Sequence, residues 1–304
     1  MKELSTFQRI IGTYTKNKKG PILLVTAAVH GNEPSGVQAL ESVFRILHSQ
    51  KPNIKGTLVG IIGNHTALQN NVRFIDEDLN RTWTEDTIEN NITDSNEKRE
   101  MFDIITLLET LKKEKSNHYY FIDCHTTSSE SLPYISVQDV GKNDSWAQEF
   151  PIHMIRGFSD IVKGTIDGYF SKQNMTGFTL EAGQHTSKDS KFYHEGIIWW
   201  ALNNICDLNF DDLTETPAAV LKTIHDTPPQ KKLKIIYRFV LKDSDDFKMI
   251  KGFENFQKIE IGEPLAVFNG KQINSVWDAY IFMPLYQAKG NDGFFIAKEI
   301  KNTL

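Results

Sequence analysis

The sequence predicts an α/β protein in which helices cover both faces of a sheet, followed by a small all-β region. Over the first two thirds of the 304 residues, short apolar runs alternate with longer segments of helical periodicity. Beyond residue 207 the apolar runs are all short and are separated by Gly, Pro, Asn and Asp. The first pattern is typical of strands interleaved with helices, and the second of a small β domain.

The order of the elements follows from periodicity and from turn residues. The run at 21–29 is apolar throughout and predicts a fully buried strand. The segment after it begins at Pro34 and repeats apolar residues at helical spacing, which indicates a helix with proline in its first turn. The remaining expected elements are a strand at 57–63, a long polar loop at 64–100, a helix from 101 to 111, strands at 119–123, near 134–138 and at 177–181, and a helix at 197–205.

The character of the chain changes near residue 207. A stretch of acidic, Pro and Lys clusters at 208–232 is interpreted as a linker with at most one helical turn. We therefore divide the chain into a large α/β domain at 1–206 and a linker with a small β-rich C-terminal domain at 207–304.

Composition excludes several classes of function. Lys and Arg number 34 against 39 Asp and Glu, a net charge of −5, and no basic run offers a surface for nucleic acid. The longest apolar stretch, at 22–29, is far shorter than the roughly 20 residues that span a bilayer. The N-terminus has no hydrophobic signal-peptide core, and two cysteines form no disulfide framework. We expect a cytoplasmic protein that binds neither nucleic acid nor membrane.

Three segments place polar residues directly after predicted strands, where ligands bind in open α/β sheets. His30 and Glu33 lie in AVHGNEPSG, His125 in FIDCHTTSS, and Glu181 in GFTLEAGQH. Two histidines and one glutamate form a common ligand set for catalytic zinc with one position open. A further carboxylate beside such a site can act as a general base and then as a general acid.

Each residue taken alone has a simpler interpretation. A histidine at a strand end is usually only hydrogen-bonded, and Glu181 alone could cap a helix or lie on the surface. The ordered combination favours a metal site, with Asp123 as a partner that orients His125 or as a structural residue. His65 and His185 lie near the same loops and are the main competing histidines.

The long polar loop contains Arg73, Asn80 and Arg81 within nine positions. Guanidinium groups hold carboxylates in bidentate geometry, so this set suits an anionic substrate and an oxyanion. The alternative is that the arginines pair with acidic residues of the same loop at 76–78.

Four ordered motifs carry a family resemblance: H-G-N-E (30–33), N-x₈-R-x-I-D-x-D-L-N-R (64–81), D-C-H-T-T-S (123–128) and L-E-A-G (180–183). The chain resembles the succinylglutamate desuccinylase/aspartoacylase family, a branch of the zinc carboxypeptidase-like amidohydrolases. The resemblance implies a three-layer αβα domain with a mixed sheet, followed by the small β domain. It also implies one zinc ion per chain, bound by His30, Glu33 and His125, and a catalytic carboxylate at Glu181.

By the same resemblance Arg73 would polarise the scissile carbonyl, and Asn80 and Arg81 would hold a substrate carboxylate. The chain departs from the aspartoacylases where they have a further arginine about ten residues before the catalytic glutamate. Ser171 and Lys172 stand there instead, and Arg156 is the nearest upstream arginine. A tyrosine that aspartoacylases take from the C-terminal domain has only a loose counterpart in Tyr286. These two differences from the aspartoacylases argue against N-acetylaspartate as the substrate.

The resulting hypothesis is zinc-dependent hydrolysis of the amide bond of a small N-acyl amino acid of acetyl or succinyl type. Glu181 would take a proton from the metal-bound water as it attacks. The alternatives are a carboxypeptidase-like peptidase on the same zinc site and a catalytically inactive protein that binds zinc or carboxylates. The acyl group, the amino acid and the oligomeric state are left open, and so is a homodimer.

Overall fold

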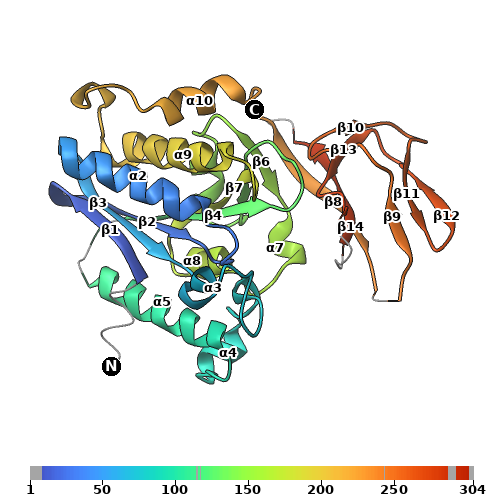
Figure 1. Cartoon of the computed structure of the whole chain (residues 1–304), viewed down its shortest axis with the longest axis horizontal. Coiled ribbons are helices and arrows are strands. Elements are labelled where there is room, and N and C mark those ends of the chain that lie inside the picture. The colour runs from blue at the N-terminus through green and yellow to red at the C-terminus, as the bar shows by residue number, and fades with distance from the viewer. Residues whose placement is uncertain (1–8, 114–115, 117, 243, 287–291, 301–304) are drawn as a thin grey trace.

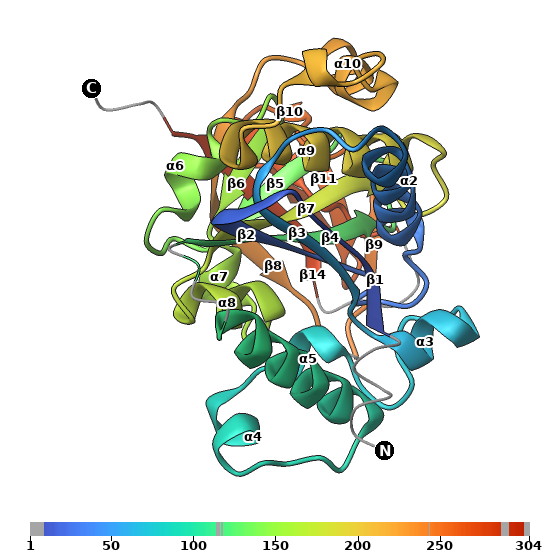
Figure 2. The same ribbon diagram turned by 90° about the vertical axis from the view of Figure 1, so that its left-hand side faces the viewer.

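A computed structural model describes residues 9–113, 116, 118–242, 244–286 and 292–300. Figures 1 and 2 show a large twisted sheet with helices packed on both of its faces, and a β-rich C-terminal region that extends to one side. The predicted mixed α/β fold with a small antiparallel sheet at the C-terminal end is confirmed. Residues 1–8, on which the expected lack of a signal peptide partly rests, lie outside the described residues.

The large sheet contains eleven strands in the order β1-β3-β2-β4-β7-β5-β6-β8-β14-β13-β10. Its strands are β1 (Ile10–Thr15), β2 (Asn17–Ala27), β3 (Lys55–Ile62), β4 (Tyr119–Thr127), β5 (Tyr134–Val137), β6 (His153–Arg156), β7 (Thr176–Gln184), β8 (Lys232–Val240), β10 (Lys258–Ile259), β13 (Ala279–Phe282) and β14 (Asp292–Glu299). The neighbours β3, β2, β4 and β7 run parallel, so their carboxyl ends meet at one edge. Ligand-binding residues are expected at that edge.

Two hydrophobic cores hold helices against the two faces of the sheet. One packs residues from α2 and α9 against β2, β4 and β7, and the other packs residues from α5 and α8 against β2, β3 and β4. The helices are α2 (Ser35–Gln50), α3 (His65–Asn70), η1 (Leu79–Arg81), α4 (Glu85–Glu89), α5 (Asn96–Lys112), α6 (Asn143–Ala147), α7 (Phe158–Ile161), α8 (Ile166–Lys172), α9 (Asp189–Cys206), η2 (Phe210–Asp212) and α10 (Ala218–Asp226).

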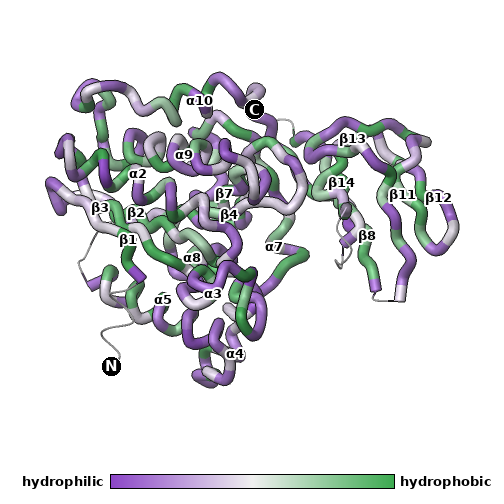
Figure 3. Tube along the Cα trace, viewed as in Figure 1, coloured by the Kyte–Doolittle hydropathy of each residue, from purple (hydrophilic) through white to green (hydrophobic). Residues whose placement is uncertain are grey.

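Hydropathy explains why the central strands form where they do. The second half of β2 is buried, as is nearly all of β3, and in Figure 3 the apolar runs of these strands are green. Strands covered by helices on both faces need apolar side chains on both sides, which is why they read as continuous apolar runs. The helix predicted after Pro34 is α2, whose buried face includes Leu40, Phe44 and Leu47.

Several boundaries differ from the sequence-based expectation. β4 and β7 are longer than predicted, so His125, expected beyond its strand, and Glu181, expected as the last residue of its strand, both lie inside strands. α5 begins at Asn96 because Ser95 accepts a hydrogen bond from the Lys98 N–H and caps the helix. The expected linker contains the nine-residue helix α10, whose buried side chains face α9.

The C-terminal strands continue the main sheet. β8 pairs in parallel with β6, and β14, β13 and β10 follow it. Strands from before and after residue 207 therefore belong to one continuous sheet. A separate antiparallel sheet is formed by β9 (Phe247–Met249), β11 (Pro264–Phe268) and β12 (Lys271–Asn274). The division of the chain at 206/207 stays a prediction.

None of the helices in the described part of the chain has both the length and the apolar character needed to cross a bilayer.

Candidate functional site

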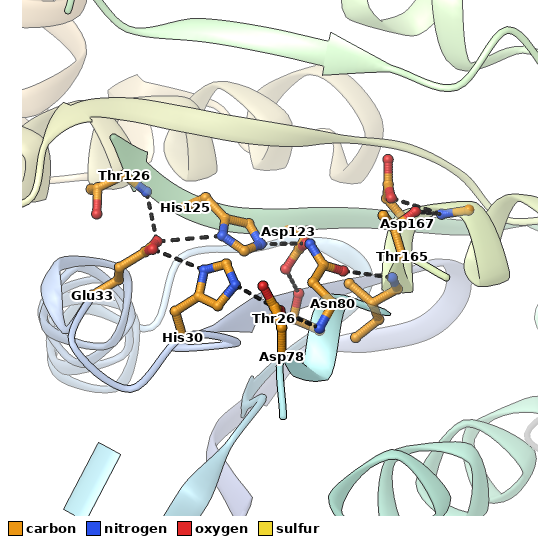
Figure 4. A network of polar contacts seen from close by, with 12 residues as sticks. Thr26, His30, Glu33, Asp78, Asn80, Asp123, His125, Thr126, Thr165 and Asp167 are labelled. Atoms are coloured by element: carbon orange, nitrogen blue, oxygen red, sulfur yellow. Dashed lines mark hydrogen bonds and ion pairs between the residues drawn. The ribbon is translucent and has the colours of Figure 1, made fainter. Parts of the chain in front are cut away.

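The predicted metal-binding side chains come together at the carboxyl end of β2 and β4. His30 and Glu33 lie in the turn between β2 and α2, and His125 lies on β4, the parallel neighbour of β2. All three are buried, and one potential ligand atom from each lies within 4.8 Å of the others. In Figure 4 the Glu33 carboxylate lies beside the two imidazole rings, and a dashed line joins it to each of them.

The turn that carries His30 and Glu33 is closed by backbone contacts. The Glu33 N–H donates to the His30 carbonyl at 3.1 Å, and the Gly31 N–H donates to the Arg73 carbonyl at 3.2 Å. A Cβ atom at Gly31 would lie 2.1 Å from the carbonyl carbon of Ala67, so only glycine fits there. The glycine lets this turn and α3 approach each other closely enough to place His30.

The hydrogen bonds of the two imidazoles define which nitrogens are available to a metal. The Nδ1 atoms of His30 and His125 lie 2.9 Å and 3.3 Å from the two oxygens of Glu33. Their Nε2 atoms lie 3.1 Å from Asp78 Oδ1 and 2.9 Å from Asp123 Oδ2. With a metal ion on the two Nδ1 atoms, the Nε2 protons would be donated to Asp78 and Asp123, the arrangement usual for histidine ligands of metals. The donor set therefore fits a divalent ion such as zinc.

Glu33 is also held from the backbone. The Thr126 N–H donates to its Oε2 at 2.8 Å, while Asp123, which is fully buried, accepts the hydroxyl of Thr26. Burial raises the pKa of Glu33, but the neighbouring His30 and His125 more than offset this and hold it well below its usual range. The carboxylate is thus kept ionised and oriented toward both rings.

Glu181 occupies the position on β7 opposite His125. Its Oε2 is buried and has no hydrogen-bond partner among the described residues. Burial raises the pKa of this carboxyl to about 7, with the charge of His125 opposing and that of Glu33 adding to the shift. Glu181 is therefore a carboxyl group able to gain and lose a proton near neutral pH. It lies on the strand next to His30, Glu33 and His125, which we call the His–Glu group.

Arg73 lies beside the same group. Its Nη2 donates to Asp78 Oδ2 at 3.0 Å, and its Nη1 lies 3.9 Å from Glu33 Oε1, with 44% of the side chain exposed. The pairing with an acidic residue of its own loop, the alternative interpretation from the sequence, is present for Arg73. The same contact directs the guanidinium toward Glu33.

Asn80 and Arg81 lie on η1, next along the same segment. The Asn80 side-chain oxygen accepts the Ile166 N–H at 2.9 Å, which leaves its amide N–H groups free of a hydrogen bond within the part of the chain that the structure describes. Arg81 is exposed, and its Nη1 donates to the Asn80 carbonyl at 2.6 Å.

The residues that stand where the aspartoacylase pattern has a further arginine and a tyrosine are bonded to other partners. Lys172 pairs with Glu85 at 2.7 Å, the Ser171 hydroxyl accepts from Asn143, and Arg156 is paired with Asp144. The Tyr286 hydroxyl bonds to the backbone of residues 250 and 253 in the C-terminal region. Of the competing histidines, His65 lies on α3 without a contact to the His–Glu group, whereas His185 Nδ1 lies 2.7 Å from Thr126 Oγ1.

Sequence reasoning missed the part that Asp78 plays. The sequence indicates it only as a partner for the arginines, whereas in the structure it bonds to His30 Nε2, to Arg73 and to the Asn80 N–H. Its place in the motif D-x-D-L-N-R is the only sequence feature that singles out Asp78. That motif does not indicate which histidine Asp78 contacts in the fold.

A cavity of about 300 Å³ opens at the same end of the sheet. It lies between the residues that follow β4, the end of β7 and a C-terminal loop, and its lining is Glu130, Ser131, Leu132, Gln184, Ser187, Glu254 and Asn255. The C-terminal region therefore borders this edge of the sheet.

Comparison with known proteins decides the family. A sequence model described as the succinylglutamate desuccinylase/aspartoacylase catalytic domain matches residues 19–194, which is more than half of the chain and contains the whole His–Glu group with Glu181. The chain belongs to the succinylglutamate desuccinylase/aspartoacylase family. Members of this family are deacylases, so membership supports deacylase activity on N-acyl amino acids.

Individual members of the family are distant from this chain. The succinylglutamate desuccinylase of Shewanella frigidimarina is 25% identical over 276 residues, which cover 83% of this chain and 74% of that protein. A crystal structure of a succinylglutamate desuccinylase/aspartoacylase from Rhodobacter sphaeroides superimposes with a TM-score of 0.70 at 14% identity, covering 95% of this chain and 88% of the other. The succinylglutamate desuccinylase of Vibrio parahaemolyticus gives a TM-score of 0.64 at 17% identity, with 95% and 84% covered. At these identities the structures establish a shared fold.

Proposed function

We propose that this protein is a zinc-dependent deacylase that hydrolyses the amide bond of a small N-acyl amino acid of acetyl or succinyl type. The observation that carries the proposal is the convergence of His30, Glu33 and His125, with Glu181 opposite His125 on the next strand. Family membership supports the reaction class, and the chemistry of the donor set supports zinc.

His30, Glu33 and His125 would hold the metal. A zinc ion bound there would supply Lewis-acid chemistry, polarising the scissile carbonyl and making water a stronger acid. Asp78 and Asp123 would accept the Nε2 protons of His30 and His125, so that both Nδ1 atoms can act as ligands.

Glu181 would move the proton. Its free Oε2 accepts a proton from the attacking water and then returns it to the departing amine nitrogen. Arg73 donates to the carbonyl oxygen as negative charge develops on it, a contribution whose loss typically lowers the rate by roughly 10²–10³. The Asn80 amide and Arg81 bind the carboxylate of the amino acid.

The test measures bound metal and then screens acetyl-, succinyl- and longer acyl-amino acids. Zinc-loaded wild-type protein should hydrolyse one of these classes, and Glu181→Gln should lower kcat by roughly 10²–10⁴ at unchanged zinc content, because glutamine keeps the shape but takes no proton. Glu195→Gln, a change at another buried glutamate, on α9, is the matched control and should keep its rate.

Equal activity of Glu181→Gln and the wild type would contradict the catalytic assignment. Activity on peptides in place of single acyl-amino acids would favour the peptidase alternative. Zinc binding without any hydrolysis would favour an inactive binding protein. A cytoplasmic location, a homodimer and the domain division remain predictions from the sequence.

A further inference from the structure

The segment that carries Arg73 and Asp78 has little apolar packing in its first half. Residues 71–76 are all exposed, and the first buried side chain along the segment is Leu79. An exposed segment without regular structure has many conformations open to it, and holding it in one costs conformational entropy. Some other contact must therefore hold it in place.

Besides the bond from the Gly31 N–H to the Arg73 carbonyl, Glu97 in the first turn of α5 makes such contacts. Its side chain accepts three successive backbone N–H groups: from Ile75 at 2.8 Å, from Asp76 at 3.0 Å and from Glu77 at 3.2 Å. The Asn64 amide is a fourth donor at 2.9 Å. In return, Asp76 accepts the Asn96 N–H at 2.7 Å, so the segment and the start of α5 are joined in both directions.

The carboxylate of Glu97 is compensated by N–H dipoles. The residue is completely buried, and its described contacts include no Lys, Arg or His side chain. Successive backbone N–H groups that point into one concavity form an anion-binding nest, which here is filled by the protein's own carboxylate. Removing the negative charge would leave the N–H groups of 75–77 without a charged acceptor.

The position of this anchor relates it to the site. Arg73 lies two residues before the anchored N–H groups and Asp78 one residue after them, and these two side chains pair across the turn at 3.0 Å. Asp78 in turn contacts His30 and accepts the Asn80 N–H. Glu97 itself contacts neither His30, Glu33 nor His125 in its described hydrogen bonds.

We propose that Glu97 is a positioning residue for substrate binding, whose buried carboxylate holds residues 75–77 and thereby Arg73, Asn80 and Arg81 in the arrangement that receives the substrate. The inference rests on the proposed function and deepens it. If the segment is released, only a fraction of molecules is ready to bind, and apparent affinity falls by that fraction. Saturating substrate restores the arrangement, so KM rises while kcat is kept.

The test compares Glu97→Gln with Glu100→Gln. Glu100 is also buried and lies one turn further along α5, but it contacts Thr66 and Arg9 and not residues 71–81. The measurements are amide hydrogen exchange at residues 75–77 and the KM and kcat of zinc-loaded protein on its best N-acyl amino acid. A hydrogen bond to a charged group contributes about 1.5–3 kcal/mol, so Glu97→Gln should raise exchange and KM by roughly 10-fold or more, with kcat within about threefold.

Three results would overturn the inference: unchanged exchange at 75–77 in Glu97→Gln, faster exchange with an unchanged KM, or the same KM increase in Glu100→Gln. If Glu97→Gln does not fold, Asp76→Ala weakens the junction from its exposed side and should give a smaller change of the same kind. No change in that variant would contradict the proposal. If the wild type hydrolyses no acyl-amino acid, the proposed function fails, while hydrogen exchange still decides whether Glu97 anchors the segment.

Discussion

Asp123 should contribute more to zinc affinity than any other residue that does not itself bind the metal. It is fully buried, and its Oδ2 lies 2.9 Å from His125 Nε2 while Oδ1 accepts the Thr26 hydroxyl. In Asp123→Asn the oxygen can keep Thr26, which directs the amide N–H toward Nε2. His125 must then carry its proton on Nδ1, the atom that faces Glu33.

The size of the effect follows from this contact. One buried hydrogen bond to a charged group is lost, about 1.5–3 kcal/mol, which corresponds to roughly 10- to 100-fold in affinity. Asp78→Asn should weaken zinc binding less, because the Asp78 side chain is 18% exposed and water can replace part of the contact with His30.

Zinc affinity is measured by competition with a chelator of known strength, with circular dichroism to check that each variant is folded. Thr26→Val is the matched control, since it removes the other partner of Asp123 and leaves the contact with His125. Unchanged zinc affinity in Asp123→Asn, or an order in which Asp78→Asn has the larger effect, would refute the reasoning.

Three further predictions concern stability. Gly31→Ala places a Cβ 2.1 Å from the Ala67 carbonyl carbon, so we expect a loss of roughly 3 kcal/mol or more in urea unfolding; a loss below 1 kcal/mol would contradict the close packing. Burial, with Lys231 nearby, lowers the pKa of His153 to about 4. The unfolded chain therefore binds the extra proton first, and stability falls as the pH drops from about 6.5 toward 4. By pH 5 the wild type should lose about 2 kcal/mol more than His153→Gln in paired unfolding curves, and parallel curves would contradict this. Removing zinc with a chelator should lower Tm, because an ion that binds only the folded state stabilises it by about 2.7 kcal/mol at 100 times its Kd; a Tm independent of zinc would argue against a bound metal.

Much of the fold could be predicted because local pattern carries it. Apolar runs such as 21–29 and the helical spacing after Pro34 reflect burial on both faces of the sheet and on one face of α2. α10 was missed because its apolar residues follow a polar, proline-containing stretch that resembles a linker, and packing against α9 decides that it is a helix. β1 and β6 were missed for a similar reason, since pairing with β3 and β8 stabilises strands that are short or only half-buried.

The sequence by itself determined that this is an acidic α/β protein of the desuccinylase/aspartoacylase type with histidine and carboxylate residues at strand ends. Motif order carries that information because the residue types needed for the chemistry recur at fixed spacing. The tertiary structure alone decided that Asp78 contacts His30 and that Glu97 accepts the N–H groups of 75–77. These pairs are 48 and 20 to 22 positions apart along the chain, and the path of an exposed loop brings them together. That path depends on packing between distant segments, which no local pattern records.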